Sequence, residues 1–214
     1  MAGFNRATRT GRCRADGAVS LLPLMPRPNW FFGFPLDGAF VEALTDVPTF
    51  LRRYHPDDIH LTLAFLGGCG QEGAERALAA LDARLESAPL HAIDATLGEV
   101  VPMGGSRRDY TALSALLDRG RAEATACVSE VRDPLTLAAT GRREKRPAKP
   151  HVTIARPMRR ATSEARAEGL AWAAELDLRS VRVRLDRIAL YTWSENRRDR
   201  LFRVVTERRL TRST

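Results

Sequence analysis

The chain has 214 residues, of which 44% are hydrophobic and 28% are charged. This balance is typical of a folded domain and argues against wholesale disorder. No apolar run approaches the roughly 20 residues that a membrane-spanning helix needs, so we expect no membrane association. The net charge of +8 suggests an anionic partner, although charge of this kind describes non-specific attraction and not a site.

The first 28 residues differ in composition from the rest of the chain. They contain five arginines and a single acidic residue, Asp16, and they show no sustained hydrophobic periodicity. We interpret residues 1–28 as a disordered basic arm and residues 29–214 as a two-lobed domain. A transit peptide would share this composition, and a true start at Met25 is a further alternative.

The cysteines and histidines give no sign of a metal site. Cys13, Cys69 and Cys127 are widely spaced and form no C-x-x-C pattern, which is typical of unpaired thiols in a reducing compartment. The four histidines do not cluster with them at the spacing of a structural zinc site. We therefore expect a cytoplasmic, monomeric protein with no metal and no cofactor.

From residue 29 onwards, strand and helix patterns alternate. Ala74, Ala77, Leu78, Leu81 and Leu85 form one apolar helix face, and glycine pairs at 67–68 and 104–105 mark turns. The basic segment 141–150 is predicted to be a loop. In chain order we predict strands at 30–35, 59–66, 90–103, 110–117, 151–156, 181–185, 188–193 and 201–205, and helices at about 37–45, 71–87, 120–132 and 165–176.

Several of the predicted strands are joined by turns that are too short for a parallel crossover. The sheets are therefore expected to be mixed or antiparallel, with the helices outside them. This places the chain in the α+β class.

A short sequence occurs twice at the start of two predicted strands. The first copy is residues 60–64, HLTLA, and the second is residues 151–155, HVTIA. On a strand, successive side chains point to opposite faces. Each copy therefore anchors its branched residues in a core and presents a histidine and a threonine on the other face. Related lobes would bring the two polar faces together across a cleft.

Two opposed imidazoles suit phosphodiester chemistry. One group must take a proton from the attacking oxygen and another must give a proton to the leaving oxygen, and histidine can do either near neutral pH. Threonine hydroxyls can hydrogen-bond the non-bridging phosphate oxygens. The candidate site is therefore His60, Thr62, His151 and Thr153. One His-x-Thr is a weak signal, whereas the repeat favours catalysis over ordinary burial.

The other candidates have weaker support. His55 and His91 lack a partner motif, and we expect structural or exposed roles for both. Arg156 directly follows the second copy and could contact RNA phosphates. Tyr191 could stack on a base, although core packing is the usual role of such a ring.

At these residues the chain resembles the two-histidine phosphoesterase superfamily, and within it the RNA 2′,3′-cyclic phosphodiesterases, which are also called 2′-5′ RNA ligases. The resemblance runs from about residue 29 to residue 210. It includes the strand at 30–34 (WFFGF), residues 59–67 (IHLTLAFLG), residues 150–156 (PHVTIAR) and residues 188–191 (IALY).

The resemblance implies a bilobal fold of two pseudo-symmetric lobes of mainly antiparallel sheet, with outer helices around a central cleft. It also implies metal-independent hydrolysis of an RNA 2′,3′-cyclic phosphate to a 2′-phosphomonoester. In this scheme His60 is the proton donor, His151 is the proton acceptor, and Thr62 and Thr153 bind the phosphate. Ligation in the reverse direction would exchange the roles of the histidines.

Two alternatives remain open from the sequence. The same site could act on small nucleotide cyclic phosphates in place of RNA ends. A different class of protein, a non-catalytic RNA-binding module, would need neither His60 nor His151.

Overall fold

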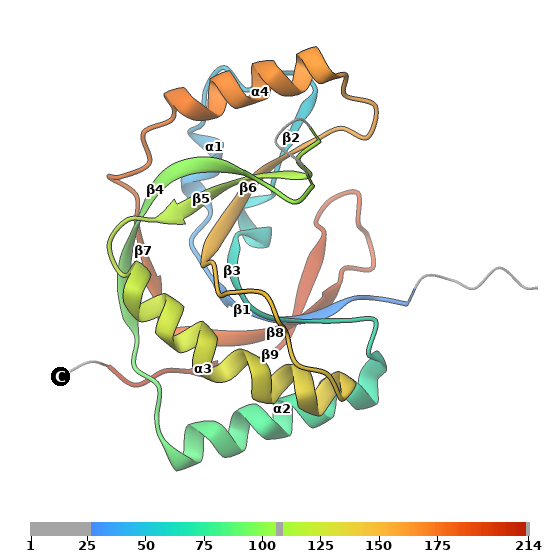
Figure 1. The fold of residues 1–214 in the computed structure, drawn as a ribbon, viewed down its shortest axis with the longest axis vertical. Coiled ribbons are helices and arrows are strands. Elements are labelled where there is room, and N and C mark those ends of the chain that lie inside the picture. The colour runs from blue at the N-terminus through green and yellow to red at the C-terminus, as the bar shows by residue number, and fades with distance from the viewer. Residues whose placement is uncertain (1–26, 106–108, 213–214) are drawn as a thin grey trace, which may run out of the picture.

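The computed structural model describes residues 27–105 and 109–212. The predicted arm at residues 1–28 therefore lies almost wholly outside the described part of the chain. Figure 1 shows a curved sheet with helices packed around its outside. No helix among the described residues is long and apolar enough to cross a membrane.

The described strands form one sheet in the order β7-β4-β5-β6-β3-β1-β8-β9, with β2 pairing to β6. Every pairing between these strands is antiparallel. The strands are β1 Trp30–Pro35, β2 Leu51–Arg53, β3 His60–Gly67, β4 Ile93–Met103, β5 Ala112–Leu117, β6 His151–Pro157, β7 Arg182–Leu185, β8 Arg187–Trp193 and β9 Phe202–Arg209.

The two strands that begin with the repeated sequence lie at the centre of this sheet. β6 is flanked by β5 and β3 is flanked by β1, and the two halves meet where Leu61 pairs with Val152. The sheet is therefore two similar antiparallel halves joined along β3 and β6. This arrangement confirms the expected α+β class and the bilobal fold.

The main core lies on one face of the sheet. Leu61, Leu63, Val152 and Ile154 are all almost completely buried there, and helices α2 and α3 pack against each other and cover this face. The branched residues of each copy thus anchor the two central strands, as the alternation predicts. The helices are α1 Ala39–Glu42, the short 3-10 turn η1 Pro56–Asp58, α2 Gly70–Ser87, α3 Arg121–Thr140 and α4 Ser163–Glu175.

Some predicted boundaries are wrong. Helix α3 continues to Thr140 instead of ending near residue 132, and Pro134 lies inside it. Leu135 and Ala139 are buried beyond the proline, and this burial offsets the lost backbone hydrogen bond. Strand β9 continues to Arg209 because it pairs with β8 along its length.

Several short elements also differ from the prediction. The first helix ends at Glu42, not near residue 45. Strand β2 and turn η1 were not predicted, since three residues are too few for a period to be visible. The strand predicted from residue 90 begins at Ile93, and the one predicted from residue 110 begins at Ala112.

Candidate active site

The structure brings the four predicted site residues together on one face of the sheet. Strands β3 and β6 pair through Leu61 and Val152, whose side chains point into the core. Because side chains alternate along a strand, His60 and Thr62 project from the opposite face of β3. His151 and Thr153 project from that same face of β6.

Both imidazoles are oriented by the same kind of hydrogen bond. His60 Nδ1 lies 2.7 Å from the backbone oxygen of Asp58, and His151 Nδ1 lies 2.6 Å from that of Lys149. A carbonyl oxygen can only accept, so Nδ1 carries the hydrogen in each ring. This leaves both Nε2 atoms available to accept or donate a proton.

Burial keeps both histidines neutral at pH 7. It lowers the pKa of His60 to about 4, although the hydrogen bond to the Asp58 carbonyl and the nearby Asp58 carboxylate oppose the shift. Burial also lowers the pKa of His151, and the positive charge of Lys149 adds to this effect. A bound phosphate would raise both pKa values because its negative charge favours the imidazolium.

An aromatic cluster accounts for the burial of His60. The ring of Phe31 lies 4.7 Å from His60 and stacks on Tyr191, while Phe202 presents its edge to the histidine at 5.6 Å. Tyr191 is only 1% exposed. In this structure its ring therefore supports His60 and offers no surface to RNA.

A β-bulge interrupts the alternation of side chains along β3 just after the site. Thr62 and Ala64 of β3 pair with two consecutive residues of β1, so Leu63, which lies between them, is the extra residue. One extra residue reverses the alternation beyond it. As a result Phe65 projects from the same face as His60, where it is 51% exposed.

Strand β6 carries the same irregularity at the same distance from its histidine. Thr153 and Ala155 of β6 pair with two consecutive residues of β5, so Ile154, which lies between them, is the extra residue. The reversal brings Arg156 onto the face of His151. Arg156 is exposed, and its guanidinium lies 5.1 Å from the centre of the Tyr54 ring.

Three residues that support the site were not predicted from the sequence. Ser114 of β5 is fully buried and hydrogen-bonds Thr153, with 3.1 Å between the two hydroxyl oxygens. Gly33 of β1 lies opposite Thr62 and leaves room beside His60. The buried Asp58 carboxylate accepts hydrogen bonds from the backbone N–H groups at the start of β9.

Only one of these three residues left a visible signal. Ser114 is the one polar residue in the otherwise apolar run at 112–117. A lone polar residue on a fully buried strand needs a partner, and that requirement alone could have marked it.

The two other histidines do not belong to strands β3 and β6. His55 caps turn η1, where its Nδ1 accepts a hydrogen bond from the backbone N–H of Asp57. His91 pairs with Thr211 near the end of the chain. Within residues 27–105 and 109–212, no group of three or more His, Cys, Asp or Glu side chains could hold a metal ion.

The family model described as the 2′-5′ RNA ligase superfamily matches residues 38–197, a range that includes both histidine strands. The chain belongs to the 2′-5′ RNA ligase superfamily. It is thereby a member of the two-histidine phosphoesterases, and this membership indicates an RNA phosphoesterase-type enzyme. The chain matched none of the curated proteins with which it was compared.

Several solved structures have a fold similar to that of this chain. Escherichia coli LigT complexed with ATP is similar at 19% identity and a TM-score of 0.60, over 86% of this chain and 98% of LigT. LigT complexed with 3′-AMP is similar at 19% identity and a TM-score of 0.59, over 86% and 98%. Usb1 of Kluyveromyces marxianus is similar at 12% identity and a TM-score of 0.52, over 78% and 95%.

Proposed function

We propose that this enzyme hydrolyses 2′,3′-cyclic phosphate ends of RNA to 2′-phosphomonoesters without a metal ion. The observation that carries the proposal is the position of His60 and His151 on the same face of two paired strands, each with Nδ1 hydrogen-bonded to a backbone carbonyl. Two oriented Nε2 atoms beside one anion are what an in-line displacement at phosphorus requires.

The proposed reaction moves one proton at each histidine. His151 Nε2 takes a proton from water as its oxygen attacks the phosphorus atom. The bond between phosphorus and the 3′ oxygen breaks, and the protonated His60 gives that oxygen its proton. His60 must therefore gain a proton before the reaction, and the negative charge of the bound phosphate favours this gain.

The threonines supply hydrogen bonds and no charge. We assign Thr62 and Thr153 to the non-bridging phosphate oxygens, where negative charge grows in the transition state. The hydrogen bond between Ser114 and Thr153 supports this role because it limits the rotation of the Thr153 hydroxyl. Arg156, on the same face, is assigned to RNA contact.

The assignment is tested with His60→Ala and His151→Ala. Each variant is expected to lower turnover of RNA with a cyclic phosphate end by at least about 100-fold, while circular dichroism shows a folded protein. Activity is expected to persist in the presence of a chelator. His91→Ala is the matched control, since His91 is bonded to Thr211 near the end of the chain, and it is expected to keep its activity.

The alternatives give different outcomes in the same experiment. Full activity in both single variants would contradict the enzyme proposal. A different result would favour a non-catalytic RNA-binding module. In that case the unmodified protein binds RNA without turning it over, and both histidine variants bind RNA as tightly as the unmodified protein does. Turnover of small nucleotide cyclic phosphates alone would favour the second substrate class.

A further inference from the structure

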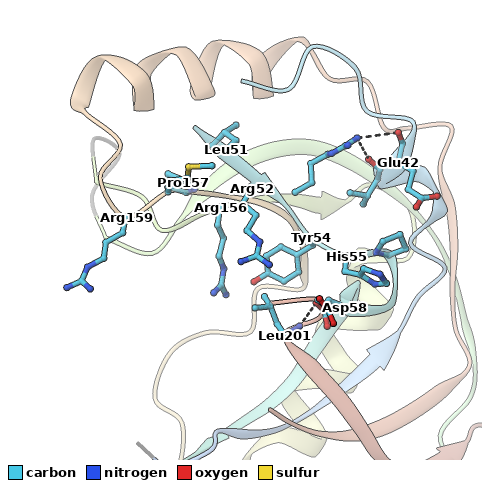
Figure 2. Close-up of a pocket in the computed structure, with 15 residues that line it drawn as sticks. Glu42, Leu51, Arg52, Tyr54, His55, Asp58, Arg156, Pro157, Arg159 and Leu201 are labelled. Atoms are coloured by element: carbon cyan, nitrogen blue, oxygen red, sulfur yellow. Dashed lines mark hydrogen bonds between the residues drawn. The ribbon is translucent and has the colours of Figure 1, made fainter. Parts of the chain in front are cut away.

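A pocket of about 800 Å³ opens beside the histidine pair. Its volume lies within the range of small-molecule binding sites. Neither His60 nor His151 lines it, but Asp58, two residues before His60, does. Figure 2 shows its lining, which includes Arg52, Arg53, Tyr54, Asp58, Arg156 and Arg159.

Two arginines occupy paired positions on β2 and β6, the strands at this pocket. Arg52 of β2 pairs directly with Arg156 of β6, so both side chains project from the same face. That face is also the face of His151, because the bulge at Ile154 places Arg156 on it. Like charges directly opposite each other are unfavourable in a sheet, and an anion between them would remove the repulsion.

The pocket is lined by four arginines and by three carboxylates, those of Glu42, Asp58 and Asp199, which leaves a net positive charge. In the part of the chain that the structure describes, Arg52, Arg156 and Arg159 form no ion pair. The Asp58 carboxylate is occupied by backbone N–H groups, and the Asp199 carboxylate accepts a hydrogen bond from the Asn196 side chain. Figure 2 places Glu42 on the side of the pocket away from Arg156 and Arg159.

The arginines lie at a distance from the histidines that suits a second phosphate. Arg156 follows His151 by five residues, which the rise of a strand converts into roughly 15 Å between their Cα atoms. A phosphate held between the histidines therefore leaves room for a nucleoside before the arginine pair. In Figure 2 the side chains of Arg52, Arg156 and Arg159 extend in the same general direction.

We propose that this pocket binds the phosphodiester and nucleoside directly 5′ to the cyclic phosphate end, so that the enzyme prefers oligonucleotides to mononucleotides. The inference rests on the function proposed above and names its substrate class. Arg52 and Arg156 hold the internal phosphodiester, and Arg159 adds positive charge at the rim. Guanidinium groups suit this role because they bind phosphate through paired N–H groups.

The test compares two substrates that differ by one internal phosphodiester. These are adenosine 2′,3′-cyclic phosphate and the dinucleotide ApA that ends in a 2′,3′-cyclic phosphate. The unmodified enzyme is expected to show a kcat/KM at least about tenfold higher for the dinucleotide. Arg159→Met and Arg52→Met are each expected to lower kcat/KM for the dinucleotide about tenfold, mainly through KM, and to change the mononucleotide value less than about twofold.

Arg160→Met is the matched control. Arg160 is exposed and adjacent to Arg159 but does not line the pocket, so its removal changes the net charge equally. We expect it to leave both substrates unaffected. The magnitude of the slope of log kcat/KM against log salt for the dinucleotide is expected to fall by about 0.7 in Arg159→Met and in Arg52→Met, and to stay unchanged in Arg160→Met.

Each outcome separates the two proposals. Equal kcat/KM for both substrates, or equal losses on both in Arg159→Met, would overturn the inference and leave the proposed reaction standing. No turnover of either substrate would overturn the proposed reaction and the inference with it.

Discussion

Arg156 occupies on β6 the position that Phe65 occupies on β3. Each lies five residues after its histidine, and a one-residue bulge brings each onto the face of the site. The two halves of the site are thus alike in backbone and different in side chain. One half presents an exposed aromatic ring and the other a cation, so the two halves can recognise different parts of a nucleotide chain.

The pH dependence of catalysis should reflect the burial of both histidines. Because the pKa of His60 falls to about 4 and that of His151 is also lowered, one protonated and one neutral imidazole coexist in the free enzyme only on the acidic side of pH 6.5. We expect kcat/KM, which reports the free enzyme, to reach its maximum below that pH. Bound phosphate raises both pKa values, so the maximum of kcat should lie at higher pH.

Pre-steady-state or steady-state rates between pH 4 and 9 would measure both profiles. The two apparent pKa values belong to the coupled pair and not to either histidine. Coincident maxima for kcat and kcat/KM above pH 8 would contradict this expectation.

The same burial should weaken the fold in acid. The folded pKa of His60, about 4, lies below the usual value of 6.5, so the unfolded chain binds more protons in this interval. The stability that neutral His60 confers is therefore lost as the pH falls from 6.5 to 4. His60→Phe, which keeps a ring in the aromatic cluster, should be inactive but should lose less stability over this range.

On acidification, the free energy of unfolding is expected to fall further in the unmodified protein than in His60→Phe. The two losses are expected to differ by an amount on the order of 2 kcal/mol, after allowance for the solvent that still reaches the imidazole. Urea unfolding at pH 7 and pH 4.5 would measure it. An identical pH dependence for the two proteins would show that His60 is not the group that titrates.

Ser114 should act on catalysis through Thr153. The two hydroxyl groups share a hydrogen bond, so Ser114→Ala frees the Thr153 hydroxyl to rotate. We expect kcat to fall about three- to tenfold and the free energy of unfolding to fall by about 1 kcal/mol. The control is Ser114→Ala combined with Thr153→Val, in which the serine substitution should add no further loss of kcat. An additive loss would assign Ser114 another role.

Gly33 should be required for the position of His60. A Cβ atom at this residue would lie 3.0 Å from the Leu61 carbonyl oxygen and 3.4 Å from His60 Cδ2, so Gly33→Ala must displace the strand or the imidazole. We expect kcat to fall by about tenfold and stability to fall by about 1–2 kcal/mol.

Gly68→Ala is the control for this prediction. Gly68 is exposed in the turn after β3, and the nearest atom to its added Cβ would be 3.4 Å away. This variant should keep its activity and stability. Unchanged kcat in Gly33→Ala would show that the imidazole tolerates the added methyl group.

Much of the site could be predicted from the residues alone. The two copies of His-x-Thr predict strands because polar and branched residues alternate in them. Successive side chains of a strand point to opposite faces, so this alternation separates the polar residues from the branched ones. The same reasoning placed Leu61 and Val152 in the core, where the structure has them. It also predicted that each copy presents its histidine and its threonine on one face, whereas the pairing of β3 with β6 put both faces on the same side of one sheet.

Other features were decided by pairing between distant segments. The bulges at Leu63 and Ile154 depend on how β1 and β5 align with the central strands, and no local pattern predicts an alignment. They determine that Phe65 and Arg156 face the site. The Arg52 and Arg156 pair likewise exists only because β2, too short to be recognised, pairs with the end of β6.

The sequence by itself determined which side chains share a face, because the period of a strand is local and depends on nothing else in the chain. Only the tertiary structure decided how those faces meet, which residues bury His60 and lower its pKa, and where the arginines gather beside it. These properties arise from contacts between residues far apart in the chain, since strand register, burial and the local dielectric depend on the complete packed sheet.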